Sequence, residues 1–348
     1  MRIVGGKEVV EVTEQLEQSY DVVVAGGGAA GLNGALMLVR ARRTVAVIDA
    51  GQPRNAPADG VHGLLARDGM PPTELLERGR TEVRGYGGHV VTGEIVAATR
   101  DENGFTVTLA DGRTVHARRL LAATGLTDEL PEIPGLSERW GRDVVHCPYC
   151  HGWEVRDRAI AVLSRGPISM HQVQLFRQLS DDIVFFTHDQ PEPTPEDAER
   201  LAARGIRVVS GTVTGIEVAD DRITGLRLAD GTVVAREVVA LGTRMVARSG
   251  FLSSLGLEAA DHPFGEYIPC DATGRTEVPG VWVAGNLTDL AAQVGAAAAA
   301  GATAGAHINA DLVQEEFDTA VAARRAGFSA PAEARLAESV NGARGHGL

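Results

Sequence analysis

The chain has 348 residues, 44% hydrophobic and only 4% aromatic, enough for one large or two ordinary domains with cores of Val, Leu, Ile and Ala. Its 33 basic and 46 acidic residues give a formal net charge of −13, which argues against a general binder of nucleic acid or anionic membranes. No segment approaches the apolar length that spans a bilayer, and no apolar stretch follows a basic start. With only three cysteines, the composition favours a cytoplasmic protein.

The first clear motif follows an N-terminal extension, residues 1–19, that carries no readable pattern. Residues 21–25 are a buried, parallel-type strand, followed by a glycine turn, a helix and a second strand that ends at Asp49. In such a unit Gly26 permits the tight turn, Gly28 lets the backbone approach a pyrophosphate, and Gly31 allows close packing of helix on strand. An acidic residue about 20 positions on accepts hydrogen bonds from a ribose. We therefore predict a dinucleotide-binding βαβ unit rather than a glycine-rich turn without a ligand.

The next stretch favours a flavin-type domain over a plain NAD domain. A loop over residues 51–55 leads to a helix at 72–86 and short strands near 89–92, 94–99 and 105–109. Asp111-Gly112 is a hairpin signal, and the return strand at 119–123 ends in Thr124-Gly125. We take this succession of strands and the Thr-Gly turn as the mark of a flavin domain.

Two of the three cysteines, Cys147 and Cys150, lie within the stretch His-Cys-Pro-Tyr-Cys-His. Their spacing puts both sulfurs on one face of a turn, and Pro148 suits the first turn of a short helix. A thiol at a helix N-terminus is favoured as thiolate, and His151 stands where a proton acceptor would be useful. Zinc is poorly supported because Cys270 stands alone, and a disulfide that closes so short a loop stabilises little. A redox-active pair is the better interpretation, with inert cysteines as the alternative.

The segment beyond the cysteines repeats the opening pattern, with a strand at 159–163, a helix at 169–179 and another strand at 182–186. We interpret it as a second nucleotide-type domain spliced into the first, whose last strand returns at 280–284 before Gly285-Asn286 and a helix led by Gln293. The predicted limits are 20–137 and 262–323 for the first domain, 138–261 for the inserted one, and 324–348 for a polar tail.

The glycine turn of the inserted domain is eroded. Ser164 occupies the position that needs glycine for the tight turn, and Ser169 occupies the position that needs glycine for close packing of the helix. Of the three glycines of the motif, only Gly166 remains. Asp189, at the tip of the next strand, would repel the 2′-phosphate of NADPH. We therefore expect no nicotinamide binding; the alternative is NADH, because a Ser-for-Gly exchange is sometimes tolerated.

Over residues 21–323 these features resemble the thioredoxin reductase family of flavoproteins with two dinucleotide-binding domains. His151 departs from that family, which usually has Asp there, and Asn286 stands where the family has Asp at the ribityl chain of the flavin. With Trp153 and the eroded turn, these departures resemble a narrower branch, the FAD-dependent dithiol oxidases of gliotoxin, holomycin and romidepsin biosynthesis. The resemblance implies an α/β fold of two Rossmann-like domains, the second inserted into the first, in a homodimer.

The resemblance also implies tightly bound FAD, a small-molecule dithiol substrate and O₂ as electron acceptor. Cys147 would be attacked by the substrate, Cys150 would lie beside the flavin, and His151 would accept thiol protons. The residues that would hold the cofactor are Gly26, Gly28, Ala30, Gly31, Asp49, Gly51, Gln52, Arg54, Asn55, Thr124, Gly125, Gly285, Asn286, Gln293 and Val294.

Three alternatives stay open at this point. The chain could reduce a thioredoxin-like protein with electrons from a nicotinamide or another donor, or it could be a flavin redox sensor without turnover. His151 could be a solvated turn histidine, and His146 and His62 are better read as structural. The sequence identifies neither the dithiol nor a role for Cys270.

Overall fold

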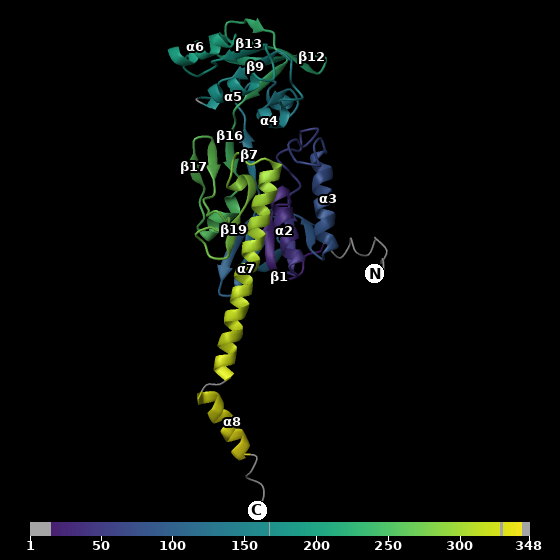
Figure 1. Cartoon of the computed structure of the whole chain (residues 1–348), viewed down its shortest axis with the longest axis vertical. Helices are drawn as coiled ribbons and strands as arrows, with labels where there is room; N and C mark the ends of the chain where they lie inside the picture. Colours follow the sequence, from purple (N-terminus) through teal and green to yellow (C-terminus); the bar gives the residue numbers. More distant parts are fainter. Residues whose placement is uncertain (1–14, 167, 328–329, 343–348) are drawn as a thin grey trace, which may run out of the picture.

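The computed structural model describes residues 15–166, 168–327 and 330–342. The chain builds two lobes, each on its own parallel-stranded sheet (Figure 1). We call the lobe that contains β1 the first lobe and the lobe that contains the cysteine pair the second lobe. The fold class expected from the sequence, α/β with two Rossmann-like units, is confirmed.

A seven-stranded sheet forms the first lobe, in the order β3-β2-β1-β6-β5-β4, and β19 pairs with the C-terminal end of β6, beyond the stretch that pairs with β5. Strands β1, β2, β3, β6 and β19 run parallel, whereas β4, β5 and β6 form an antiparallel meander. The parallel strands read as continuous apolar runs because helices cover them. The bounds are β1 (Ser19–Ala25), β2 (Val45–Asp49), β3 (His89–Thr92), β4 (Ile95–Asp101), β5 (Gly104–Leu109), β6 (Thr114–Ala122) and β19 (Val281–Val283).

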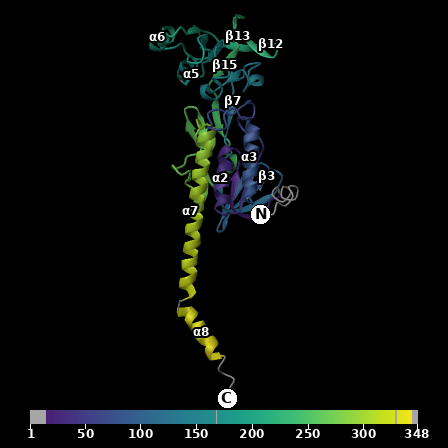
Figure 2. The ribbon, with the colours of Figure 1, turned by 45° about the vertical axis from the view of Figure 1, so that its right-hand side comes forward.

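Three helices belong to this lobe: α2 (Ala29–Arg40), α3 (Pro72–Gly85) and α7 (Val294–Gly327). Helices α2 and α7 lie side by side in both views (Figures 1 and 2). Their backbones touch, because a Cβ on Gly301 would stand 1.9 Å from the carbonyl oxygen of Ala30, and one on Gly305 would stand 2.6 Å from that of Gly34. Only glycine permits so close an approach.

The second lobe holds a five-stranded parallel sheet in the order β11-β10-β9-β15-β8. A three-stranded antiparallel sheet, β12-β13-β14, packs with it around one apolar core. The bounds are β8 (Val144–Val145), α4 (Pro148–His151), β9 (Ile160–Leu163), α5 (Ile168–Phe176), β10 (Ile183–Phe186), α6 (Pro195–Ala203), β11 (Arg207–Val209), β12 (Val213–Ala219), β13 (Arg222–Leu228), β14 (Val233–Val234) and β15 (Val238–Leu241).

The chain crosses between the lobes along two antiparallel strands, β7 (Leu126–Glu129) and β16 (Arg244–Ala247). Strands β17 (Ala260–His262) and β18 (Gly265–Tyr267) extend this pair into a four-stranded sheet. Phe251, Leu252 and Leu257 are buried in a core cluster of the first lobe, although the predicted limits place them in the inserted domain. The second crossing therefore lies nearer to β16 than to the predicted limit at residue 261. Short 3₁₀ turns complete the chain: η1 (Ser137–Arg139), η2 (Gly250–Leu255) and η3 (Gly285–Leu287).

The C-terminal part differs from the polar tail expected from residue 324 onward. Helix α7 continues to Gly327 and α8 spans Ala330–Gly342, because this stretch is rich in Ala, Glu and Arg, which favour helix. In both views α7 extends well beyond the body of the first lobe (Figures 1 and 2). Residues 1–14, most of the expected N-terminal extension, and residues 343–348 lie outside the described residues. Within the described part, no helix combines the length and apolarity needed to cross a membrane.

Candidate active site

The glycine turn of the first lobe forms a cradle at the start of α2. Gly26 has a φ of +100°, and a Cβ there would stand 2.5 Å from the carbonyl oxygen of Ala123. At Gly31 a Cβ would stand 1.9 Å from the carbonyl oxygen of Gly26, so the helix lies directly on the turn. Gly28 is the N-cap, and no side chain caps this end of α2. The open N–H groups and the positive end of the helix dipole suit a pyrophosphate.

Asp49 ends β2 beside this turn, where a Cβ on Gly27 would stand 2.8 Å from its carboxylate. Arg80 of α3 donates from Nη2 to Asp49 Oδ2 at 2.9 Å. The arginine holds the carboxylate in place while the other oxygen stays available to a ribose hydroxyl. Arg80 was not identified from the sequence, because no local motif links it to a residue 31 positions away.

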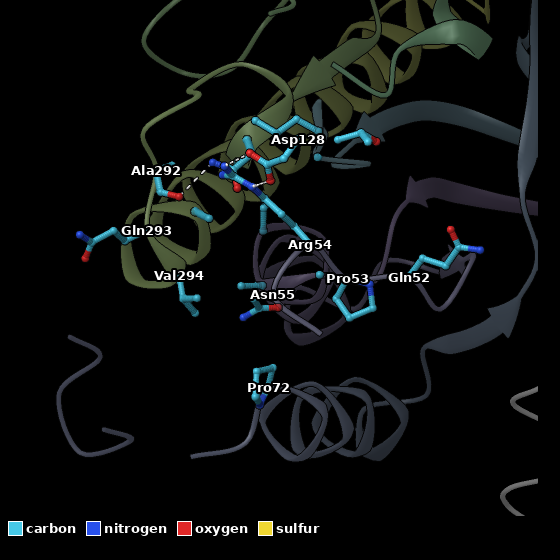
Figure 3. Close-up of a pocket in the computed structure, with 18 of the residues that line it drawn as sticks. Gln52, Pro53, Arg54, Asn55, Pro72, Asp128, Ala292, Gln293 and Val294 are labelled. Atoms are coloured by element: carbon cyan, nitrogen blue, oxygen red, sulfur yellow. Dashed lines mark hydrogen bonds and ion pairs between the residues drawn. The ribbon is translucent and has the colours of Figure 1, made fainter. Parts of the chain in front are cut away.

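A cavity of about 1230 Å³ runs from the glycine turn to the cysteine pair. Figure 3 shows part of its wall, including Gln52, Arg54, Asn55, Gln293 and Val294. Of the predicted site residues, Gly31 and Gly51 do not line it: Gly31 lies under the turn, and Gly51 lines a smaller pocket on the other side of Asp49. The cavity brings together Gly26, Gly28, Ala30, Asp49, Gln52, Arg54, Asn55, Thr124, Gly125, Cys147, Cys150, His151, Gly285, Asn286, Gln293 and Val294.

Several of the polar side chains predicted along the cofactor hold the cavity wall together. Arg54 makes a two-pronged ion pair with Asp128, Nε to Oδ2 at 2.7 Å and Nη2 to Oδ1 at 2.8 Å (Figure 3). Burial alone would raise the pKa of Asp128, but Arg54 and a hydrogen bond from Thr243 hold that pKa below its ordinary value. Asn286 donates from Nδ2 to the carbonyl oxygen of Ala292 at 2.9 Å, which fixes the loop before α7. Direct contact of these side chains with the cofactor stays a prediction.

The cysteine pair lies on α4, with Cys147 as N-cap and Pro148 as the first residue, as the Pro position suggested. Both cysteines are half-buried. A hydrogen bond from the Cys150 thiol lowers the pKa of Cys147 to about 7, and the positive charge of Arg54 contributes in the same direction. The same hydrogen bond, together with burial, raises the pKa of Cys150. In the reduced pair Cys147 is therefore the thiol that ionises first, near pH 7, while Cys150 keeps its proton.

His151 follows Cys150 and lines the cavity. Both ring nitrogens are buried and have no hydrogen-bond partner among the described residues. Burial lowers the pKa of His151, so the imidazole is neutral near pH 7 and one nitrogen can accept a proton. His146 differs, because its Nδ1 donates to the carbonyl oxygen of Leu241 at 3.1 Å. His62 lies with Nε2 3.4 Å from a carboxylate oxygen of Glu154.

The corresponding turn of the second lobe is closed by its own side chains. The N–H of Arg165 donates to Ser169 Oγ at 2.9 Å, and Ser164 and Ser169 are both buried. Asp189 accepts a hydrogen bond from Gln190 and carries a negative charge where a 2′-phosphate would lie. Pro167, within this turn, lies outside the described residues. The backbone N–H that would donate to a nucleotide phosphate is thus already hydrogen-bonded within the protein.

The fold and the site define a two-lobed flavoprotein that acts on thiols and disulfides. Residues 20–327 match the family described as pyridine nucleotide-disulphide oxidoreductase, and the chain belongs to this family. It is a thioredoxin reductase-like enzyme with FAD as cofactor, which confirms the family resemblance and the cofactor expected from the sequence. The cradle, the acidic residue at the end of β2 and the elongated cavity fit FAD.

Individual relatives agree with this assignment. The chain is 30% identical to thioredoxin reductase tcpT of Claviceps purpurea over 312 residues, covering 85% of this chain and 95% of that protein. It is 30% identical to thioredoxin reductase sirT of Leptosphaeria maculans, covering 83% of this chain and 93% of that protein. Among solved structures it is similar to HlmI, with 45% identity, a TM-score of 0.84, and coverage of 90% of this chain and 99% of that chain. An oxidoreductase from Agrobacterium tumefaciens has 34% identity and a TM-score of 0.80, with coverage of 85% and 99%.

Proposed function

We propose that the chain oxidises a small-molecule dithiol to the cyclic disulfide and passes the two electrons to O₂. The reaction balances as one dithiol and one O₂ giving one disulfide and one H₂O₂. The observation that carries the proposal is the contrast at the two nucleotide turns: the first is open, whereas the Ser169 side chain closes the second. A chain that cannot receive hydride from a nicotinamide needs another electron source, and the cysteine pair opens into the cofactor cavity. The resemblance of His151, Asn286 and the eroded turn to the dithiol oxidases supports the same direction of electron flow.

The cysteine pair would do the sulfur chemistry. A substrate thiolate attacks the Sγ of Cys147 in the Cys147–Cys150 disulfide, which breaks the S–S bond and forms a mixed disulfide. The second substrate thiol attacks the substrate sulfur of that mixed disulfide, which releases the product and leaves both cysteines reduced. Cys147 leaves readily because its pKa is about 7.

His151 would supply the proton acceptor that this chemistry needs. The raised pKa of Cys150 means that its proton must be removed before it can act as a thiolate. The neutral imidazole next to it in the chain has two nitrogens without a partner in the described structure. FAD, held at the glycine turn of the first lobe, would supply the two-electron chemistry that links the cysteine pair to the acceptor.

A homodimer, a cytoplasmic location and a place in natural-product biosynthesis belong to the same proposal. The homodimer and the place in natural-product biosynthesis rest on the resemblance to the dithiol oxidases, and the cytoplasmic location rests on the cysteine content. They are independent of the cysteine chemistry and need their own measurements.

Anaerobic rapid mixing tests the proposal. We expect an excess of dithiothreitol to bleach the flavin absorption near 450 nm, and NADH or NADPH to leave it unchanged over the same time. Air should then restore the band with one H₂O₂ per dithiol, and Cys147→Ser should abolish the bleaching. Rapid bleaching by NADPH would favour a reductase such as the thioredoxin reductases named above. Dithiol oxidation no faster than in Cys147→Ser would favour a redox sensor.

A further inference from the structure

Gln172, on α5 of the second lobe, has an unusual hydrogen-bonding state. The residue is 6% exposed and lines the cavity. Its Nε2 donates to the carbonyl oxygen of His146 at 2.6 Å, whereas its Oε1 is buried and has no partner among the described residues. Exchanging the amide oxygen and nitrogen would not help, because the carbonyl of His146 can only accept and requires the NH₂ group to face it. The orientation of the amide is therefore set, and one buried acceptor is left unpaired.

Besides Gln172, α5 gives the cavity wall two apolar residues, Ile168 and Leu175, and the exposed His171. Ile168 lies four positions before Gln172 and Leu175 three positions after it, so all three lie on one face of α5, and all three line the cavity. A mostly apolar wall with a few polar groups in defined orientations is the usual design of a small-molecule site. An unpaired buried acceptor destabilises the free protein, and such groups concentrate at functional sites.

Gln172 is tied to the reacting sulfur. The carbonyl that it holds belongs to His146, the residue directly before Cys147. The glycine cradle lies on the first lobe, whereas the wall with Gln172 and the cysteine pair belongs to the second. At about 1230 Å³ the cavity exceeds the roughly 300–1,000 Å³ of a common single-ligand site, which leaves room for a substrate beside the cofactor.

We propose that Gln172 Oε1 accepts a hydrogen bond from the dithiol substrate, which therefore carries an N–H or O–H group close to its thiols. This inference rests on the proposed function and deepens it. The donor is neutral, because a buried cation would lose its hydration against an amide oxygen that offers no compensating charge. Gln172 is thus a specificity-determining residue that holds the substrate with one of its thiols toward Cys147.

Three dithiols test this with the FAD-loaded enzyme. Dithiothreitol carries two hydroxyls, butane-1,4-dithiol has the same skeleton without them, and bis(mercaptoacetyl)hydrazine carries amide N–H groups. The measured quantity is the KM of butane-1,4-dithiol divided by the KM of each donor-bearing dithiol. We expect Gln172→Met to lower at least one of these ratios about tenfold from the wild-type value, since the acceptor is lost. The ratio that falls further identifies O–H or N–H as the donor.

Two variants serve as controls. Gln174→Met makes the same chemical change on the exposed face of α5, outside the cavity lining, and should leave both ratios within twofold of wild type. Gln172→Glu keeps an acceptor oxygen at the same reach and should keep the preference for donor-bearing dithiols, even if the lost contact with His146 slows turnover.

A binding measurement separates this inference from the proposed function. Bis-S-methyl dithiothreitol and bis-S-methyl butane-1,4-dithiol, titrated calorimetrically into Cys147→Ser holoenzyme, report recognition without any electron transfer. We expect Gln172→Met in this background to remove the preference for the hydroxylated compound. If Gln172→Met changes neither the KM ratios nor the preference in the titration, the inference is overturned. A shift of the flavin spectrum in Gln172→Met with both quantities unchanged also overturns it, because Gln172 would then contact the cofactor. A wild type that no dithiol reduces overturns the proposed function, while the titration still decides the role of Gln172.

Discussion

The two lobes begin with the same succession of strand, turn and helix, yet we expect only the turn of the first lobe to receive a nucleotide. In the first lobe Gly31 brings α2 against the turn and leaves the N-terminus of the helix without a side-chain cap. In the second lobe Ser169 stands at the matching position, and its hydroxyl accepts the N–H of Arg165. A single side chain thus replaces a phosphate as hydrogen-bond partner. The second lobe keeps the architecture of a nucleotide domain and uses it to present the cysteine pair and Gln172.

The largest expected effect is the loss of FAD when one methyl group is added at the glycine turn of the first lobe. In Gly31→Ala the new Cβ would stand 1.9 Å from the carbonyl oxygen of Gly26, so α2 must move away from the phosphate position. We expect the purified variant to be colourless, with an absorbance ratio of 450 to 280 nm at background. Ser169→Ala, the matched change in the second lobe, should stay fully yellow. A yellow Gly31→Ala would contradict the assignment of the cofactor to the first turn.

The second effect concerns the cysteines that the second lobe carries. The Cys150 thiol lowers the pKa of Cys147 to about 7, so Cys150→Ala should raise that pKa toward its ordinary value of 9.0. The thiolate fraction below pH 7 then falls by up to about 100-fold, since each pKa unit is a factor of ten. The measurement is the rate of Cys147 alkylation by iodoacetamide against pH in reduced protein, followed by mass spectrometry. Cys270→Ala should leave the midpoint in place; an equal midpoint in Cys150→Ala would show that the hydrogen bond is not the cause.

A smaller effect tests whether Asp49, held in place by Arg80, binds the ribose of FAD in the first lobe. Arg80→Met removes the partner of Asp49, and both side chains are largely buried. We expect FAD affinity to fall about fivefold, because losing a hydrogen bond that orients the carboxylate costs about 1 kcal/mol. Reconstitution of the apoprotein, followed by flavin fluorescence, gives the Kd. Arg78→Met, which breaks an exposed pair with Glu74 on the same helix, should not change the Kd.

The smallest effect is expected from repairing the second turn. In the Ser164→Gly, Ser169→Gly double variant, bleaching of the flavin by NADPH should stay at background, because Asp189 still opposes a 2′-phosphate. Anaerobic stopped-flow absorbance at 450 nm measures it. Fast bleaching would mean that the serines alone exclude NADPH and that Asp189 does not.

Sequence patterns were sufficient for features that depend on neighbours in the chain. The strand before Gly26, the helix start at Pro148 and the erosion at Ser164 and Ser169 are local, and the structure has each of them. Arg80, Asp128 and Gln172 were not recognised, because each acts through a partner that the fold brings from a distant part of the chain. The expected tail after residue 324 was judged by polarity, which does not separate a solvated helix from coil.

Helix α7 connects the two ends of the cofactor cavity. It starts at Val294, beside Gln293 on the cavity wall, and about two and three turns further on Gly301 and Gly305 press on the backbone of Ala30 and Gly34. A displacement of α7 at the cavity wall must therefore displace α2 as well, because at the glycine contacts the two backbones touch with no side chain between them that could adjust its conformation. We therefore expect bound flavin to strengthen the packing of α7 on α2, and thermal unfolding of the protein without flavin to begin at α7.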